Sequence, residues 1–96
     1  MGYDLRATKG EEELYIEVKG SAESDIGNVT GGFTPNEYKV SKNDCDKYRI
    51  CIIANALFNP IVYEFNWHRR QGTWNNKKHS LKLKLQERIA ANFSVE

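Results

Sequence analysis

Apolar and polar side chains alternate along the first nineteen residues, in two runs that a glycine separates. The runs are residues 3–8 and 13–19, and Gly10-Glu11 stands between them. Alternation with a period of two is typical of β-strands, and a Gly-X pair suits a two-residue type II′ turn. The pattern therefore predicts a β-hairpin in which Leu5 pairs with Ile16 and Asp4 pairs with Glu17.

This register divides the hairpin into an apolar face and a polar face. A slip of one residue would oppose apolar with polar side chains, so the pattern fixes the register. On the polar face, Asp4 and Glu17 repel each other, and Mg²⁺ is typically held by one or two carboxylates together with waters. Lys19 lies two residues beyond Glu17 and shares its face. Such a face can bind a metal ion, position a water and neutralise a phosphate.

The next segment predicts a loop followed by a helix. Residues 20–32 are rich in Gly and Ser and lack periodicity, so we expect a loop that borders the polar face. A functional loop and a tolerated surface insertion both explain it. Thr34-Pro35 is a typical helix start, and Glu37 completes a capping box. We expect the helix to end near Cys45 and Glu37 to have mainly this structural role.

The second half adds strands. Residues 48–54 are almost continuously apolar, which is typical of a central strand buried on both faces. Residues 61–65 predict a further strand, so the element order indicates an α+β fold with a mixed sheet. Residues 80–85 alternate like a strand. However, the apolar stripe that continues beyond them and the many good helix formers favour a helix from about Leu81 to Asn92.

Aromatic and basic residues are interleaved between residues 66 and 79. Tryptophan can stack on bases while arginine and lysine contact phosphates. The alternative is a loop whose tryptophans cover the sheet, which is favoured for Trp67 and equally plausible for Trp74. The candidate nucleic-acid-binding residues are Arg69, Arg70, Trp74, Lys77 and Lys78.

Composition limits the remaining choices. The 96 residues are 40% hydrophobic and 28% charged, which is ordinary for one soluble domain with a modest core. Net charge is −4 over residues 1–48 and +5 over residues 49–96. This asymmetry suits a metal-dependent enzyme acting on a polyanion, although an ordinary solvated surface explains it as well. We find no signal peptide, no stretch long enough to span a membrane and no zinc-finger pattern, so we expect a cytoplasmic protein.

The runs GYDLRAT and LYIEVKG resemble the NO VEIN C-terminal domain family, which is found in plants and is appended to many bacterial restriction and helicase proteins. The family's Ser/Thr-x-Asn-Glu segment is matched here by Thr34-Pro35-Asn36-Glu37, which the resemblance places near the same site. The resemblance covers residues 2–65. The family in turn resembles the PD-(D/E)xK nuclease superfamily.

The resemblance implies a restriction-endonuclease-like core and an Mg²⁺- or Mn²⁺-dependent endonuclease that hydrolyses DNA. Asp4, Glu17 and Lys19 match the three signature positions and would be catalytic. Asp4 and Glu17 would hold the metal, with the main-chain carbonyl of Val18 as a third ligand. Lys19 would orient or deprotonate the attacking water and stabilise charge in the transition state.

Family members usually carry an upstream helix with a further Glu, and the present chain starts at the motif. We therefore expect residues 1–96 to be a single nuclease-like domain and a fragment of a larger multidomain restriction or defence protein. Its expected partners are DNA and other domains of the parent, and a homodimer is an open alternative. Two other functions also stay open: an inactive nuclease-fold module for protein docking, and a reader of modified DNA.

Overall fold

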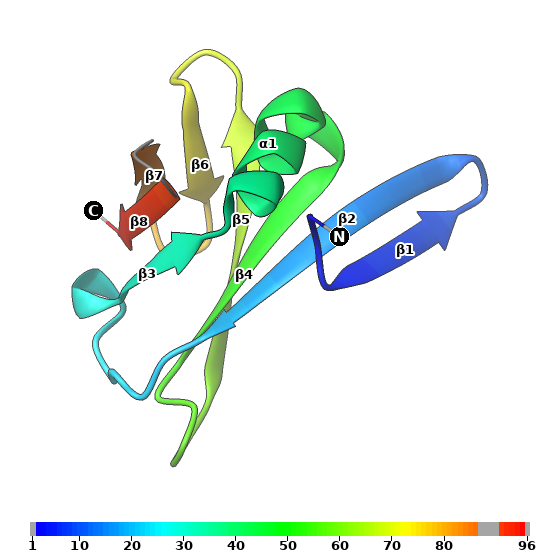
Figure 1. The fold of residues 1–96 in the computed structure, drawn as a ribbon. Helices are drawn as coiled ribbons and strands as arrows, with labels where there is room; N and C mark the ends of the chain where they lie inside the picture. The colour runs from blue at the N-terminus through cyan, green and yellow to red at the C-terminus, as the bar shows by residue number, and fades with distance from the viewer. Residues whose placement is uncertain (1, 87–90, 96) are drawn as a thin grey trace.

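The computed structural model describes residues 2–86 and 91–95, which form one eight-stranded mixed sheet with α1 (Pro35–Asn43) against it (Figure 1). The strands are β1 (Leu5–Lys9), β2 (Glu12–Gly20), β3 (Thr30–Phe33), β4 (Tyr48–Ala54), β5 (Ile61–His68), β6 (Thr73–Asn76), β7 (Leu81–Gln86) and β8 (Ala91–Val95). Short 3₁₀ helices η1 (Ile26–Asn28) and η2 (Cys45–Lys47) lie in the connections. The sheet order is β1-β2-β4-β5-β6-β7-β8-β3. Strands β2 and β4 are parallel and the other neighbours are antiparallel, which confirms the predicted mixed α+β sheet.

The predicted hairpin register is confirmed. Leu5 pairs with Ile16, and the ladder continues to the turn at Gly10, whose φ of 62° lies in the left-handed region that glycine adopts without penalty. Asp4 lies just before the ladder, where its backbone N–H donates to the Ile16 carbonyl at 3.0 Å. The hairpin therefore brings Asp4 to the strand that carries Glu17.

The polar face of the hairpin is the face directed toward the core. Glu17 pairs with Ile50 across the parallel β2–β4 ladder, and both residues are fully buried. On the opposite face, Ile16 and Val18 are only half-buried and Leu5 is 57% exposed. A half-buried strand ordinarily does the reverse and turns its apolar side inward.

Strand β4 alternates between full and partial burial. Tyr48, Ile50, Ile52 and Ala54 are all fully buried, whereas the residues between them are half-buried. The prediction of a strand buried on both faces is therefore wrong for one face. The physical reason is that α1 and the curled far end of the sheet pack against a single side of β4.

Curling of the sheet encloses the core. The ring of Phe33 on edge strand β3 lies 6.5 Å from the ring of Tyr48 on β4 and 6.0 Å from that of Phe93 on β8. Tyr38 and Val40 of α1 pack against the same cluster. In Figure 1, α1 lies in front of β4 and β5, and β3 lies close to the helix start. The core is thus closed between the concave face of the sheet and one helix.

Helix α1 and its capping box are as predicted. The Thr34 hydroxyl accepts a hydrogen bond from the Glu37 backbone N–H at 3.1 Å, and the Glu37 carboxylate accepts one from the Thr34 N–H at 2.8 Å. The predicted loop, in contrast, is too long, because β3 already begins at Thr30. A methyl group on Gly31 would lie 2.5 Å from a ring carbon of Phe93, so the glycine that suggested a loop makes room for an aromatic ring beside a strand.

The predicted C-terminal helix is wrong where the structure describes the chain. Residues 81–86 and 91–95 form the antiparallel strands β7 and β8, and residues 87–90 lie outside the described part. Leu83 is fully buried and pairs with Trp74 on one side and Val95 on the other. Because β7 has a neighbouring strand on each side, its leucines can pack on one face of the sheet. This packing outweighs the helix propensity of the segment.

The aromatic and basic segment is largely sheet rather than loop. Strand β5 continues to His68, and β6 follows after a turn in which Gly72 has a φ of 63°. Trp67 and Trp74 pair across these two strands. Their burial places them in the sheet-covering role that was one of the two alternatives.

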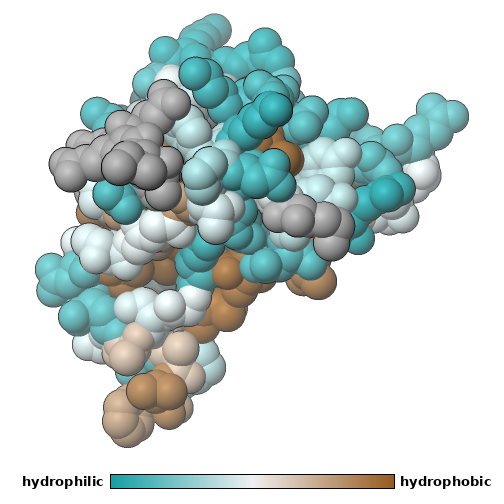
Figure 2. Space-filling model, viewed as in Figure 1, coloured by the Kyte–Doolittle hydropathy of each residue, from teal (hydrophilic) through white to brown (hydrophobic). Residues whose placement is uncertain are grey.

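Among the residues whose exposure the structure describes, the most exposed large apolar side chains lie at the tip of the β4–β5 hairpin. Leu57 is 76% exposed and Phe58 is 86% exposed, and the brown lower end of the molecule in Figure 2 corresponds to this region. Within the described residues, no helix has the length and apolar character needed to cross a membrane.

Candidate active site on the polar face of the hairpin

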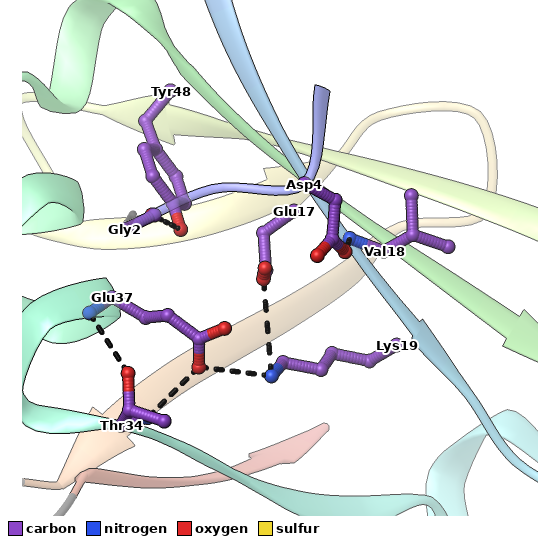
Figure 3. Close-up of polar contacts among 8 residues, drawn as sticks. All are labelled: Gly2, Asp4, Glu17, Val18, Lys19, Thr34, Glu37 and Tyr48. Atoms are coloured by element: carbon purple, nitrogen blue, oxygen red, sulfur yellow. Dashed lines mark hydrogen bonds and ion pairs between the residues drawn. The ribbon is translucent and has the colours of Figure 1, made fainter. Parts of the chain in front are cut away.

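Asp4, Glu17 and Lys19 gather where the start of β1, the middle of β2 and the first turn of α1 meet (Figure 3). Glu17 and Lys19 share a face because they are two residues apart on a strand. The Asp4 carboxylate accepts a hydrogen bond from the Val18 backbone N–H at 2.9 Å. This bond holds the Asp4 carboxylate against β2 and leaves it exposed to solvent.

Glu17 is an unusual carboxyl group. It is fully buried, and neither of its oxygens has a hydrogen-bond partner among the described residues. Burial, then the neighbouring Glu37 carboxyl and the charge of Asp4, raise the pKa of Glu17 to about 8, and Lys19 opposes the shift. Burying a carboxylate without partners is costly, so Glu17 is a group that a cation would stabilise strongly.

Lys19 is held in place from several directions. Its Nζ donates to Glu37 Oε1 at 3.1 Å, lies 3.9 Å from Glu17 Oε2 and stands 5.0 Å from the centroid of the Phe33 ring. Its side chain is 24% exposed. The result is a fixed ammonium group that reaches the edge of the site.

Glu37 carries the negative charge of the carboxyl pair. Burial raises its pKa, but the hydrogen bond from the Thr34 N–H and the neighbouring Glu17 and Lys19 outweigh that effect, and the pKa falls below its ordinary value. The two neighbouring carboxyls thus have pKa values shifted in opposite directions, so Glu37 ionises at a lower pH than Glu17.

Tyr48 fixes the segment that delivers Asp4. Its buried hydroxyl donates to the Gly2 carbonyl at 2.8 Å (Figure 3). Gly2 lies directly under α1, since a Cβ there would be 2.4 Å from a methyl carbon of Val40. The start of the chain is therefore clamped between β4 and the helix, two residues before Asp4.

The residues that would hold a metal ion are Asp4 and Glu17, and the family resemblance implies the Val18 main-chain carbonyl as a third ligand. Among the described residues, no group of three or more His, Cys, Asp or Glu side chains is arranged to hold an ion. The two carboxylates still fit an oxygen-preferring cation that keeps several waters, as Mg²⁺ does. The observation that supports this fit is that, in the part of the chain that the structure describes, no group makes a hydrogen bond to the buried Glu17 oxygens.

The structure divides the predicted nucleic-acid-binding residues between the two ends of β6 and the core. Arg69 and Arg70 lie in the turn before β6, and Lys77 and Lys78 lie in the turn after it, at the opposite end of that strand. Arg69 pairs with Asp46. Trp74 is only 3% exposed, and its ring packs edge to face on Tyr48 and Trp67.

Sequence reasoning missed two contributors to the site. Tyr48 was assigned only to a strand, although a tyrosine in an otherwise apolar run signals a hydroxyl that needs a buried partner. Phe33 had no role, and no sequence signal placed it against Lys19. Glu37 was expected to be a cap near the site, and the structure brings its carboxylate into direct contact with Lys19.

Fold and site together define a small mixed-sheet domain with a buried acid and a fixed lysine on an N-terminal hairpin. Residues 1–65 match the family described as "Protein NO VEIN, C-terminal", and the chain belongs to this family. The matched region contains every residue of the site, whereas β6, β7 and β8 lie beyond it. No curated protein and no solved structure matches the chain.

Proposed function

We propose that this chain is a nuclease-like domain that binds DNA and hydrolyses phosphodiester bonds with Mg²⁺ or Mn²⁺, as part of a restriction or defence protein of the cytoplasm. The observation that carries the proposal is the fully buried Glu17, whose carboxyl oxygens have no hydrogen-bond partner among the described residues and lie 3.9 Å, at Oε2, from the fixed ammonium of Lys19. The order Asp4, Glu17, Lys19 also resembles the PD-(D/E)xK signature, and a restriction-endonuclease-like core is part of the proposal.

In this scheme Asp4, Glu17 and the Val18 carbonyl would hold the ion. A bound Mg²⁺ would polarise the phosphodiester and lower the pKa of a bound water. Glu17 must give up its proton to serve as a ligand, so the site exchanges a proton for a cation. The Lys19 ammonium, already fixed by Glu37, would donate to the attacking water or to a phosphoryl oxygen that gains charge.

A protein-docking module is the second candidate. The observation in its favour is the tip of the β4–β5 hairpin, where Leu57 and Phe58 are 76% and 86% exposed. Exposed apolar clusters of this kind often mark interaction sites. In that case the site would bind neither metal nor DNA.

The test is a titration with Mg²⁺ followed by NMR of the backbone amides, on the wild type, Asp4→Asn and Asp25→Asn. Asp25 is a matched control because it is an exposed carboxylate that caps η1 away from the site. We expect the amides of Glu17 and Val18 to shift in the wild type and in Asp25→Asn, and to stay unchanged in Asp4→Asn. Absence of shifts in the wild type at millimolar metal would overturn the proposal and leave the docking module.

A further inference from the structure

The carboxylate of Glu37 joins the start of α1 to Lys19. A single oxygen, Oε1, accepts both the Thr34 backbone N–H at 2.8 Å and the Lys19 ammonium at 3.1 Å (Figure 3). One bond closes the capping box, and the other ties the helix to the polar face of β2. The same atom therefore belongs to a local helix cap and to a contact between residues 18 positions apart.

We propose that Glu37 is a positioning residue, which holds the Lys19 ammonium beside Glu17 so that the lysine and helix α1 assemble as one unit. The consequence for catalysis rests on the proposed function. The position of the Lys19 ammonium does not depend on the proposed function, and it can be measured without any reaction.

The other neighbours of Lys19 cannot fix it alone. At 3.9 Å, Glu17 Oε2 is too far from Nζ for a hydrogen bond, and the contact with the Phe33 ring imposes little direction. A free lysine side chain has high rotamer entropy, which favours its dispersal into solvent. The charge-assisted bond to Glu37 is the directional contact that opposes this dispersal.

The cap does not require the negative charge of Glu37. A capping box works with Gln as well as with Glu, because only a side-chain oxygen has to reach back to the N-cap N–H. The contact that uses the charge of Glu37 is the one with the Lys19 ammonium. If Glu37 serves only as a helix cap, Glu37→Gln should leave the Lys19 ammonium in place. If Glu37 positions Lys19, the same substitution should release the ammonium.

Three variants separate the two explanations. Glu37→Gln keeps an oxygen for the Thr34 N–H but removes the charge that faces Lys19. Thr34→Val removes the hydroxyl that caps the helix but leaves the Glu37 carboxylate in place. Glu64→Gln is the matched control, because it removes the acidic partner of Arg49 in an ion pair on the other face of the sheet.

The measurement is hydrogen exchange of the Lys19 side-chain NH₃⁺ group by ¹⁵N NMR on the full chain. We expect a protected signal in the wild type, Thr34→Val and Glu64→Gln, and exchange about tenfold faster in Glu37→Gln, because a charge-assisted bond is replaced by a weaker neutral one. An unchanged signal in Glu37→Gln would overturn the proposal. So would an equal acceleration in Thr34→Val, since that would make the cap responsible.

Cleavage of plasmid DNA with Mn²⁺ separates this inference from the proposed function. We expect Glu37→Gln to lower kcat about tenfold with little change in KM, because a misplaced lysine weakens the transition state more than binding. If the wild type neither binds Mn²⁺ nor cleaves DNA, the proposed function fails and the Lys19 signal still decides the role of Glu37. If the wild type cleaves and Glu37→Gln cleaves equally fast, the positioning role fails and the proposed function stands.

Discussion

Strand β2 reverses the usual distribution of side chains, because its inner face is polar and its outer face is apolar. The face directed toward α1 carries Glu17 and Lys19, whereas the outer face carries Ile16 and Val18, which remain half-buried. Exchanging these faces would bury more apolar surface and would release a carboxyl group from the interior. The domain therefore accepts a loss of stability on its inner face, and such a loss is typical of a site that serves function.

The largest expected effect compares an apolar residue on each face. Ile50 is fully buried beside Glu17, so Ile50→Ala should cost about 2–5 kcal/mol of unfolding free energy. Val62 on the outer face is 60% exposed, so Val62→Ala should change it by no more than about 0.5 kcal/mol. Urea unfolding measures both. Equal losses would show that the outer face is covered in solution.

Glu17→Gln tests the cost of the buried carboxyl group through the pH dependence of stability. Because folding raises the Glu17 pKa from 4.5 to about 8, the folded wild type binds the extra proton, and its stability should fall as pH rises through that window. The lowered pKa of Glu37 acts in the opposite direction at lower pH. We expect the variant to lose this dependence and to exceed the wild type above pH 8 by an amount of the order of a few kcal/mol.

Thermal unfolding at several pH values, with and without Mg²⁺, tests this expectation. Under the proposed function, added Mg²⁺ should restore the wild type at high pH and leave Glu17→Gln unchanged, because only the wild type offers a carboxylate to the ion. Parallel pH profiles for the two proteins would show that Glu17 is not the group responsible.

Tyr48→Phe tests the support beneath Asp4. Loss of the buried hydroxyl leaves the Gly2 carbonyl without this partner and should cost about 1–3 kcal/mol. Metal binding should also weaken, because the segment before Asp4 loses an anchor. Tyr63→Phe is the control, since Tyr63 is 9% exposed and lies against His79 outside the site. Mn²⁺ affinity and urea unfolding are the readouts, and equal effects of the two substitutions would refute the anchoring role.

The smallest effect is expected at the far end of the polar face. Arg6 pairs with Glu13 across β1 and β2, but the Arg6 side chain is 57% exposed. Arg6→Ala should therefore change the unfolding free energy by about 0–1 kcal/mol and leave metal binding intact. Urea unfolding measures this change. A larger loss would show that the exposed end of the polar face, and not only the buried end with Glu17, contributes to stability.

Sequence reasoning succeeded where the determining contacts are local. The register of the hairpin follows from alternation over residues 3–19, and the start of α1 follows from Thr34 and Glu37. The order Asp4, Glu17, Lys19 was likewise readable, and the structure brings these three residues together. Each of these features depends on residues close together in the sequence.

The rest depends on distant partners. Residues 81–92 contain both a strand pattern and helix formers, and only pairing of Leu83 with Trp74 and Val95 decides between them. Gly31 signals a loop until Phe93 is placed beside it. The burial of Glu17 is set by β4 and α1, so neither the raised pKa nor the role of Tyr48 could be derived from the hairpin alone.

The parallel pairing of β2 with β4 bears on the order of events during folding. Residues 21–47 separate the two strands, so their pairing requires closure of a long loop, whereas the β1–β2 hairpin needs only its own turn. The hairpin can thus form early with Glu17 still in water and titrating as an ordinary acid. Glu17 is buried only once β4 and α1 have packed against β2, so the acid acquires its raised pKa after the hairpin has formed.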